Sequence, residues 1–264
     1  MRKQVAVALT VAGSDSGGGA GIQADLKTFA ALGVHGTSAI TCITAQNPEA
    51  VLGVEPCKPR MLELQLAAVF SKLTPQAVKS GMLFSAELIR VLTDFFGARN
   101  RPPLVVDPVM IATSGAVLLK ASAVKALTRD LLPLAALATP NLHEAEHLLG
   151  YTIRNVEELQ KAARHFFESF GCPVLLKGGH LRDTRYATDV FFDGRKEFVL
   201  KAPFIRNIGT HGTGCTYSAA VTALLARGNS LPTAVRQAKT FITDAIKQSY
   251  RVGAHSVLNT SWQK

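Results

Sequence analysis

The sequence predicts a three-layer α/β/α protein whose central sheet is doubly wound and mostly parallel. Short apolar runs alternate with helix-periodic segments along most of the 264 residues, and this alternation is typical of βαβ units with helices on both faces of a sheet. A hydrophobic content of 47% can fill one large core. No linker, repeat or low-complexity tract interrupts the pattern, so we expect a single domain over residues 1–264.

The N-terminal half should alternate regularly between strands and helices. An apolar strand at 5–12 leads through a glycine-rich loop into a helix at 21–32. Further strands are expected at 37–44, 77–79, 104–107 and 137–139, with helices at 59–73, 85–96 and 122–132. Ligands of such sheets bind beyond the carboxyl ends of the strands, so the loops that follow the strands should carry the site.

The C-terminal half should depart from a purely parallel order. After Gly150 we expect a helix that ends near residue 170 and a strand at 174–177. Short runs at 189–192 and 197–200 predict an antiparallel pair, and two helices close the chain. Exposed strand edges in such domains are often covered by a second copy, which favours a homodimer.

Charge and composition exclude some classes of partner. The chain holds 29 Lys and Arg against 19 Asp and Glu, a net charge of +10, which suits an anionic ligand such as ATP. The basic residues are scattered and no aromatic residues alternate with them, so we expect no nucleic-acid partner. No apolar stretch approaches the roughly 20 residues needed to span a bilayer, and we expect no membrane partner.

Cysteine usage and the N-terminus favour a cytoplasmic location. The four cysteines form no C-x-x-C pair, which argues against a disulfide framework or a structural zinc site. Residues 1–12 resemble a short signal peptide, but a glycine loop and a helix follow them directly. A buried first strand is therefore the favoured interpretation.

The first glycine-rich loop, residues 13–21, is a candidate ligand site. Its five glycines would let the backbone approach a ligand closely. Residues 19–24 match a loose dinucleotide fingerprint, but no acidic residue follows within the expected distance, and no P-loop motif occurs. Asp25 and Gln46 are expected on the same side of the sheet, where a carboxylate and an amide could read the edge of an aminopyrimidine.

A second glycine-rich turn, residues 207–214, leads into a convincing helix near the C-terminus. Unpaired N–H groups and the helix dipole should converge there on negative charge, such as the oxygens of a transferring phosphate. Cys215 stands in the first turn of that helix, where the same field should lower the pKa of its thiol and suit it to act as a base. Cys42, Cys57 and Cys172 are better interpreted as small buried hydrophobic residues.

Seven motifs in one order connect these loops to a family. They are residues 12–28 (AGSDSGGGAGIQADLKT), 44–47 (TAQN), 79–82 (KSGM), 107–110 (DPVM), 139–141 (TPN), 177–180 (KGGH) and 211–215 (HGTGC). From about residue 5 to residue 226 the chain closely resembles the bacterial hydroxymethylpyrimidine/phosphomethylpyrimidine kinases of the ribokinase-like superfamily. The loop 110–115 has no cysteine and residues 253–259 lack the family's closing proline and histidine.

The resemblance implies an activity and a set of site residues. The implied reaction is ATP- and magnesium-dependent phosphorylation of 4-amino-5-hydroxymethyl-2-methylpyrimidine, and then of its monophosphate, for thiamine biosynthesis. The residues implied for the pyrimidine pocket are Gly13, Asp25, Gln46, Met82 and Val109. Those implied for ATP are Asn141, Lys177, Thr213 and Gly214, with Asp107 and Glu144 near the metal and Gly212, Thr213, Gly214 and Cys215 at the reacting phosphate.

Three rival interpretations remain from the sequence. A pyridoxine or pyridoxal kinase of the same superfamily is the nearest, although the missing cysteine in the loop 110–115 speaks against it. His143-Glu144-Ala145-Glu146-His147 satisfies the H-E-x-x-H pattern of zinc metallopeptidases, but its expected helix is only about two turns long. A non-catalytic vitamin-binding protein is disfavoured because both glycine loops and Cys215 are present together.

Overall fold

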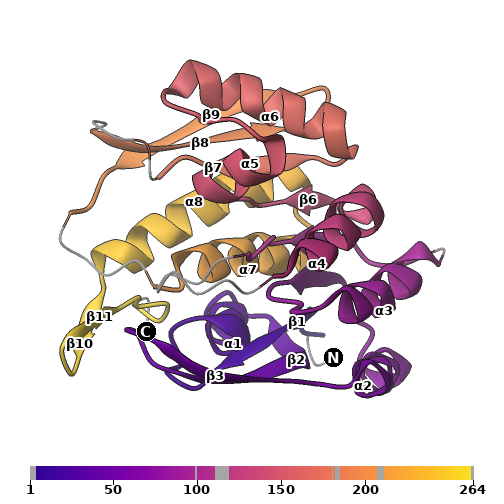
Figure 1. Cartoon of the computed structure of the whole chain (residues 1–264). Coiled ribbons are helices and arrows are strands. Elements are labelled where there is room, and N and C mark those ends of the chain that lie inside the picture. The colour runs from indigo at the N-terminus through magenta and orange to yellow at the C-terminus, as the bar shows by residue number, and fades with distance from the viewer. Residues whose placement is uncertain are drawn as a thin grey trace.

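A nine-stranded sheet organises the described part of the chain. The computed structural model describes residues 4–98, 100–110, 119–179, 181, 185–206 and 211–262. Most of the loop 110–115, His180 and the start of the second glycine turn, residues 207–210, lie outside these ranges. The strand order is β3-β2-β1-β4-β5-β6-β7-β8-β9, which Figure 1 shows running through the molecule.

The central strands are parallel and the edges antiparallel. The parallel set comprises β1 (Val7–Asp15), β2 (His35–Gln46), β4 (Ala77–Ser80), β5 (Leu104–Val106), β6 (Leu137–Ala138) and β7 (Val174–Lys177). The antiparallel strands are β3 (Val51–Pro56), β8 (Tyr186–Phe192) and β9 (Glu197–Pro203). The order reverses between β1 and β4, so the loops after these two strands flank a topological switch point.

Two groups of helices pack around the sheet. One group is α1 (Gly21–Ala31), α7 (Thr213–Ala226) and α8 (Leu231–Lys247), and the other is α2 (Pro59–Lys72), α3 (Ala86–Gly97), α4 (Ala121–Ala126), α5 (Leu142–Leu149) and α6 (Val156–Phe170). Alternating strand residues divide between them: Leu104 and Val106 belong to the core under the second group, whereas Val105 belongs to the core under the first. This period of two is expected of a sheet covered on both faces. The predicted doubly wound α/β/α fold is thereby confirmed.

The helix α7 is buried on nearly every side. Its residues from Thr216 to Leu224 are all buried, and its sequence combines small apolar residues with Ser and Thr and contains no charged side chain. It contacts the neighbouring helices α1 and α8 and the strands β1, β4 and β5. The first turn of α7 is therefore held at the carboxyl end of the sheet, next to the loop that follows β1.

Local sequence explains where α5 begins and ends. Asn141 caps α5 by accepting the N–H of Glu144, whose carboxylate accepts the N–H of Asn141 in return. The helix ends at Gly150, which adopts a left-handed φ of 80°. The sequence thus fixes the short helix that carries Glu144.

Two elements differ from expectation. The helix expected at 122–132 is α-helical only as far as Ala126. It continues as a π-helical turn over Leu127–Leu131 and a 3₁₀ turn over Leu132–Leu134. Pro133 explains the change, because it lacks the N–H that an α-helix would need and clashes with the preceding turn. The strand β3 and the hairpin of β10 (Tyr250–Val252) and β11 (His255–Val257) were not expected at all.

No helix within the described ranges is long and apolar enough to cross a membrane.

Candidate active site

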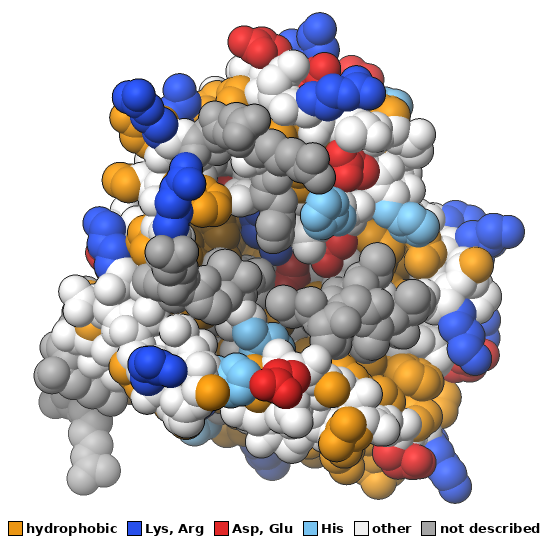
Figure 2. Space-filling view, turned by 60° about the vertical axis from the view of Figure 1, so that its left-hand side comes forward, with side chains coloured by type: hydrophobic (Ala, Val, Ile, Leu, Met, Phe, Trp, Pro, Cys, Tyr) orange, Lys and Arg blue, Asp and Glu red, His pale blue; other side chains and the backbone are white. Residues whose placement is uncertain are grey.

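One cavity of about 790 Å³ lies at the carboxyl end of the parallel strands. Its wall includes residues that follow β1, β4, β5, β6 and β7, together with the first turn of α7. Figure 2 looks into this hollow, where charged side chains lie at depth and histidines lie near the opening. A volume of this size suits one or two small molecules.

The two glycine loops meet at this cavity. His211 Nε2 lies 3.1 Å from Asp15 Oδ2, which joins residues 196 positions apart. A Cβ atom at Gly212 would collide with the carbonyl oxygen of Gly19. Gly212 also has a left-handed φ of 80°, so both sterics and backbone conformation require glycine there.

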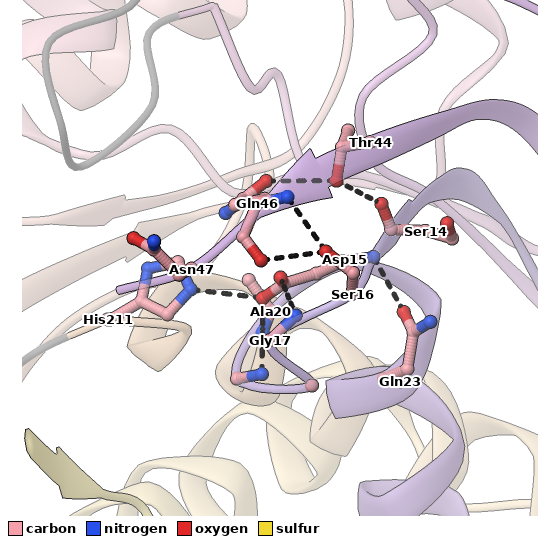
Figure 3. A network of polar contacts seen from close by, with 12 residues as sticks. Ser14, Asp15, Ser16, Gly17, Ala20, Gln23, Thr44, Gln46, Asn47 and His211 are labelled. Atoms are coloured by element: carbon pink, nitrogen blue, oxygen red, sulfur yellow. Dashed lines mark hydrogen bonds and ion pairs between the residues drawn. The ribbon is translucent and has the colours of Figure 1, made fainter. Parts of the chain in front are cut away.

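The Asp15 carboxylate organises the first loop (Figure 3). It accepts the backbone N–H groups of Gly17, Gly19 and Ala20 at 2.8 to 3.1 Å. Burial alone would raise the pKa of Asp15, but hydrogen bonds from His211, Ala20 and Gly17 outweigh burial and lower it. Asp15 therefore stays ionised, and its oxygens are occupied by protein donors.

Four of the five residues expected to hold a pyrimidine line the cavity: Gly13, Gln46, Met82 and Val109. A Cβ atom at Gly13 would lie 2.6 Å from Cys42 Sγ and 3.6 Å from Met82 Sδ. Gly13 thus gives the wall its close packing against two sulfur-bearing side chains. Burial raises the pKa of Cys42 to about 11, so its thiol is an unreactive group packed against Gly13.

Asp25, the fifth, does not line the cavity. Its side chain is fully buried and accepts two 2.8 Å hydrogen bonds from Lys79 Nζ and one from the hydroxyl of Thr10. The expectation that Asp25 reads a ring edge overlooked this partner, because pairing across β1, β4 and α1 is not visible in the sequence. Burial alone would lower the pKa of Lys79, but Asp25 outweighs burial and raises it. Lys79 is therefore a buried cation at the base of the cavity.

A second group of charges gathers where ATP was expected. Asp107 Oδ1 accepts a 3.1 Å hydrogen bond from Lys177 Nζ, and Ser218 donates to Asp107 Oδ2 at 3.2 Å. Glu144 lines the cavity beside them, and burial, reinforced by Asp107, raises the pKa of Glu144 to about 7. The expected ATP and metal residues Asn141, Lys177, Thr213, Gly214, Asp107 and Glu144 all contribute to the cavity wall.

Gly214 leaves space for the lysine of this group. A Cβ atom at Gly214 would lie 3.2 Å from Lys177 Nζ and 4.0 Å from Asp107 Oδ2. Burial alone would lower the pKa of Lys177, but Asp107 and Glu144 together raise it. A charged ammonium therefore stands beside the first turn of α7.

Cys215 lies between the loops but is not acidified. It lines the cavity, and the backbone of Gly21, at the start of α1, lies near enough to contribute to its pKa. The expectation of a lowered pKa is wrong: burial raises the pKa of Cys215 to about 11, and Lys79 offsets this only in part. Desolvation of the thiolate exceeds the helix-terminus effect, and the sequence pattern could not reveal the depth of burial.

The cavity also contains a wall that sequence motifs did not indicate. Ala187 and Ala202 from the antiparallel strands and Phe204, Ile242 and Ile246 form an apolar part of the lining. Lys239 of α8 is bound to strand β8, because its Nζ donates to Asp189 Oδ2 at 2.7 Å and to the carbonyl oxygen of Ala187 at 3.0 Å. These residues are far apart in the chain and none stands in a glycine motif, so only strand register and helix packing bring them together.

The zinc-peptidase interpretation has no geometric support in the described ranges. His143 is exposed and lies 3.4 Å from Glu146, and Glu144 is engaged in the cap of α5. No cluster of three or more His, Cys, Asp or Glu suited to a metal occurs among the residues that the structure describes. Structural zinc sites and catalytic zinc sites both need at least three protein ligands.

The family model and the curated relatives point to the same family. A family model described as phosphomethylpyrimidine kinase matches residues 15–259. The hydroxymethylpyrimidine/phosphomethylpyrimidine kinase of Rhizobium meliloti is 49% identical over 251 residues, which cover 94% of this chain and 92% of that protein. Its counterpart from Bacillus subtilis is 44% identical over 247 residues, which cover 94% and 91%.

Solved structures are similar over nearly the whole chain. The phosphomethylpyrimidine kinase of Clostridium difficile 630 is 42% identical, with a TM-score of 0.81. The match covers 92% of this chain and 100% of that chain. The Staphylococcus aureus pyridoxal kinase in complex with AMP-PCP and pyridoxal is 35% identical with a TM-score of 0.89, covering 99% and 96%.

The buried Lys79 and Asp25 pair makes stability sensitive to either partner. Asp25→Ala should lower the free energy of unfolding by about 3–5 kcal/mol, because it leaves Lys79 buried without its counterion. The double variant Lys79→Met with Asp25→Leu should recover much of that loss. Denaturant unfolding checks both, with Glu63→Ala in the exposed pair with Arg60 as a control that should change little. A small effect of Asp25→Ala would show that the pair is not a buried electrostatic unit.

The raised pKa of Cys215 predicts slow alkylation. Because only the thiolate reacts, iodoacetamide modification of Cys215 should accelerate about tenfold per pH unit between pH 7 and pH 10. Mass spectrometry of the Cys215 peptide measures the rate, and the urea-unfolded chain provides the unperturbed control. A rate that levels off near pH 8 in the folded protein would contradict the burial argument.

Proposed function

Because this chain belongs to the phosphomethylpyrimidine kinase family, we propose that it phosphorylates 4-amino-5-hydroxymethyl-2-methylpyrimidine with ATP and then converts the monophosphate to the diphosphate, in thiamine biosynthesis. The observation that carries the proposal is the meeting of both glycine loops at one cavity, with Cys215 between them. One loop adjoins the pocket of Gly13, Gln46, Met82 and Val109, and the other begins α7. A ring and a transferring phosphate can therefore occupy adjacent parts of one cavity.

The first turn of α7 supports the role of an anion hole. In this proposal the N–H groups of Thr213, Gly214 and Cys215 face the phosphate oxygens, where the helix dipole also favours negative charge. Lys177 adds a cation beside Gly214. The arrangement stabilises charge on the transferring group, which is the main requirement of phosphoryl transfer.

The charges near Asp107 fit a magnesium ion. Two buried carboxylates lie close enough that Asp107 contributes to the raised pKa of Glu144, and a divalent cation would relieve that repulsion. Magnesium prefers oxygen ligands and is commonly held by one or two carboxylates together with phosphates. Asp107 and Glu144 are the residues that would hold it, and the ion would neutralise phosphate charge.

We assign the adenine of ATP to the apolar wall near α8. Ala187, Ala202, Ile242 and Ile246 offer an apolar surface in the cavity wall. Asn141 and Lys177 then contact the phosphate chain. This placement gives the nucleotide and the alcohol different sets of lining residues in one cavity.

Cys215 is proposed as the base of the first step alone. In that step the alcohol oxygen forms a bond to the γ-phosphorus, the bond to ADP breaks, and the alcohol proton must leave. In the second step the attacking oxygen belongs to a phosphate that is already anionic. A thiol with a pKa of about 11 must first lose its proton, so the first step should accelerate with pH more strongly than the second.

We also propose a homodimer in the cytoplasm. The edge strand β3 leaves Leu52 78% exposed, and Ile43 on the neighbouring β2 is 56% exposed. An unpaired edge with apolar side chains is normally covered. A second copy of the chain is the simplest cover.

Product analysis tests the proposed function. The protein is incubated with ATP, magnesium and either the hydroxymethylpyrimidine or pyridoxal, and the products are identified by mass spectrometry. We expect a monophosphate and then a diphosphate from the pyrimidine. Phosphorylation of pyridoxal without any pyrimidine product would replace the proposal with the alternative kinase activity.

The two steps should respond differently to loss of the thiol. Cys215→Ala should slow phosphorylation of the alcohol by about 100-fold or more, while phosphorylation of the monophosphate changes much less. Separate kcat measurements from each starting compound check this, with Cys57→Ala as a matched control outside the cavity lining. Equal losses in both steps would eliminate the base role and leave Cys215 as part of the anion hole.

A further inference from the structure

A polar contact between Asp15 and His211 connects the two loops of the cavity. Asp15 lies at the end of β1 and His211 lies just before α7, and their side chains are 3% and 17% exposed. We refer to Asp15 and His211 together as the clasp. Neither residue has a role in the reaction as proposed so far.

The Asp15 carboxylate accepts hydrogen bonds from several protein groups. Its Oδ1 accepts the N–H of Gly17, and its Oδ2 accepts the N–H groups of Gly19 and Ala20 as well as the contact from His211. Figure 3 shows these donors converging on the carboxylate from two separate segments. With all of these donors in place, the carboxylate has little capacity left for substrate.

His211 stands where it can set the position of the anion hole. It directly precedes Gly212, the N-terminal cap of α7, and Thr213 is the first residue of that helix. Gly212 lies against the carbonyl of Gly19, and a Cβ atom at Gly19 would meet the His211 ring at 2.7 Å. The backbone that would bind phosphate is thus packed on the backbone of the substrate loop, and the clasp is the polar bond across this junction.

Only one ring nitrogen of His211 is used. Nε2 contacts Asp15, while Nδ1 is buried and has no hydrogen-bond partner among the described residues. A side chain that offers a donor near the position of Nε2 should therefore substitute for histidine. Glutamine provides such a donor, whereas leucine has a similar size without one.

We propose that Asp15 and His211 are positioning residues that hold the first turn of α7 in register with the substrate loop for both phosphoryl transfers. The inference rests on the proposed function. Because the same anion hole would serve both steps, loosening it should lower kcat of both steps by a similar factor. The KM of the alcohol should change little, because the residues proposed to hold the ring do not take part in the bond between His211 and Asp15.

The experiment compares His211→Leu and His211→Gln with the wild-type enzyme. His211→Leu should lower kcat of both steps by about 10- to 100-fold, the loss expected from a small misplacement of reacting groups. His211→Gln should stay within about threefold of wild type, because it restores the donor. His35→Leu, an exposed histidine at the start of β2, provides the matched control.

A double-variant cycle tests whether Asp15 and His211 act as a unit. Asp15→Ala combined with His211→Leu should be no slower than Asp15→Ala alone, because the bond is already lost. Multiplicative losses, a loss confined to one step, or wild-type kcat in His211→Leu would overturn the proposal. If His211→Leu does not fold, His211→Asn keeps a polar side chain too short to reach Asp15 and takes its place.

Different measurements test the proposed function and the proposed role of the clasp. Wild-type products identify the alcohol that the enzyme accepts, and the variants are compared with wild type on that alcohol. Absence of pyrimidine products in the wild type contradicts the proposed function, whereas the ratio of variant to wild-type kcat decides the role of the clasp.

Discussion

The close approach of the two glycine loops is the constraint on which the site depends. Gly212 lies so near the carbonyl of Gly19 that no side chain fits between them, and Asp15 completes the junction through His211. The loops belong to opposite ends of the chain. Their contact places the N-terminus of α7 beside the carboxyl end of β1, so that residues from both ends of the chain line one cavity.

The buried charges of the site are arranged in pairs. Lys79 is bound to Asp25, Lys177 is bound to Asp107, and Lys239 is bound to Asp189. A buried ion is tolerated only with a partner and satisfied hydrogen bonds. Their carboxylate partners raise the pKa values of Lys79 and Lys177, so these two ammonium groups stay charged beside the cavity.

Burial is the main reason why the pKa of Cys215 is raised, because it removes water from the thiolate. Lys79 offsets part of this effect, while Asp107 and Asp25 reinforce it. The helix N-terminus acts as only about half of an elementary positive charge, so its effect on the pKa is smaller than that of the full charges nearby. The local sequence predicts the helix terminus at Cys215, but it does not reveal that the carboxylates of Asp107 and Asp25 lie nearby.

The apolar core elements were predictable because their patterns are local. The strand at 174–177 has the predicted bounds, and the helices at 21–32 and 59–73 each end one residue earlier than expected. The strand β3 escaped prediction because its residues are half or fully exposed and it contains Gly53. Its strand conformation depends on antiparallel pairing with β2, which is a tertiary interaction.

The sequence by itself determined the α/β/α class, both glycine loops, the cap of α5 and the family, because apolar period, glycine placement and motif order are properties of neighbouring residues. Tertiary structure alone decided that Asp25 faces Lys79 and not the cavity, that burial raises the pKa of Cys215, and that Asp15 meets His211 across 196 residues. The physical reason is that ion pairing, desolvation and loop contact depend on distances in space. Strand register and helix packing set those distances, and no single segment of the chain contains them.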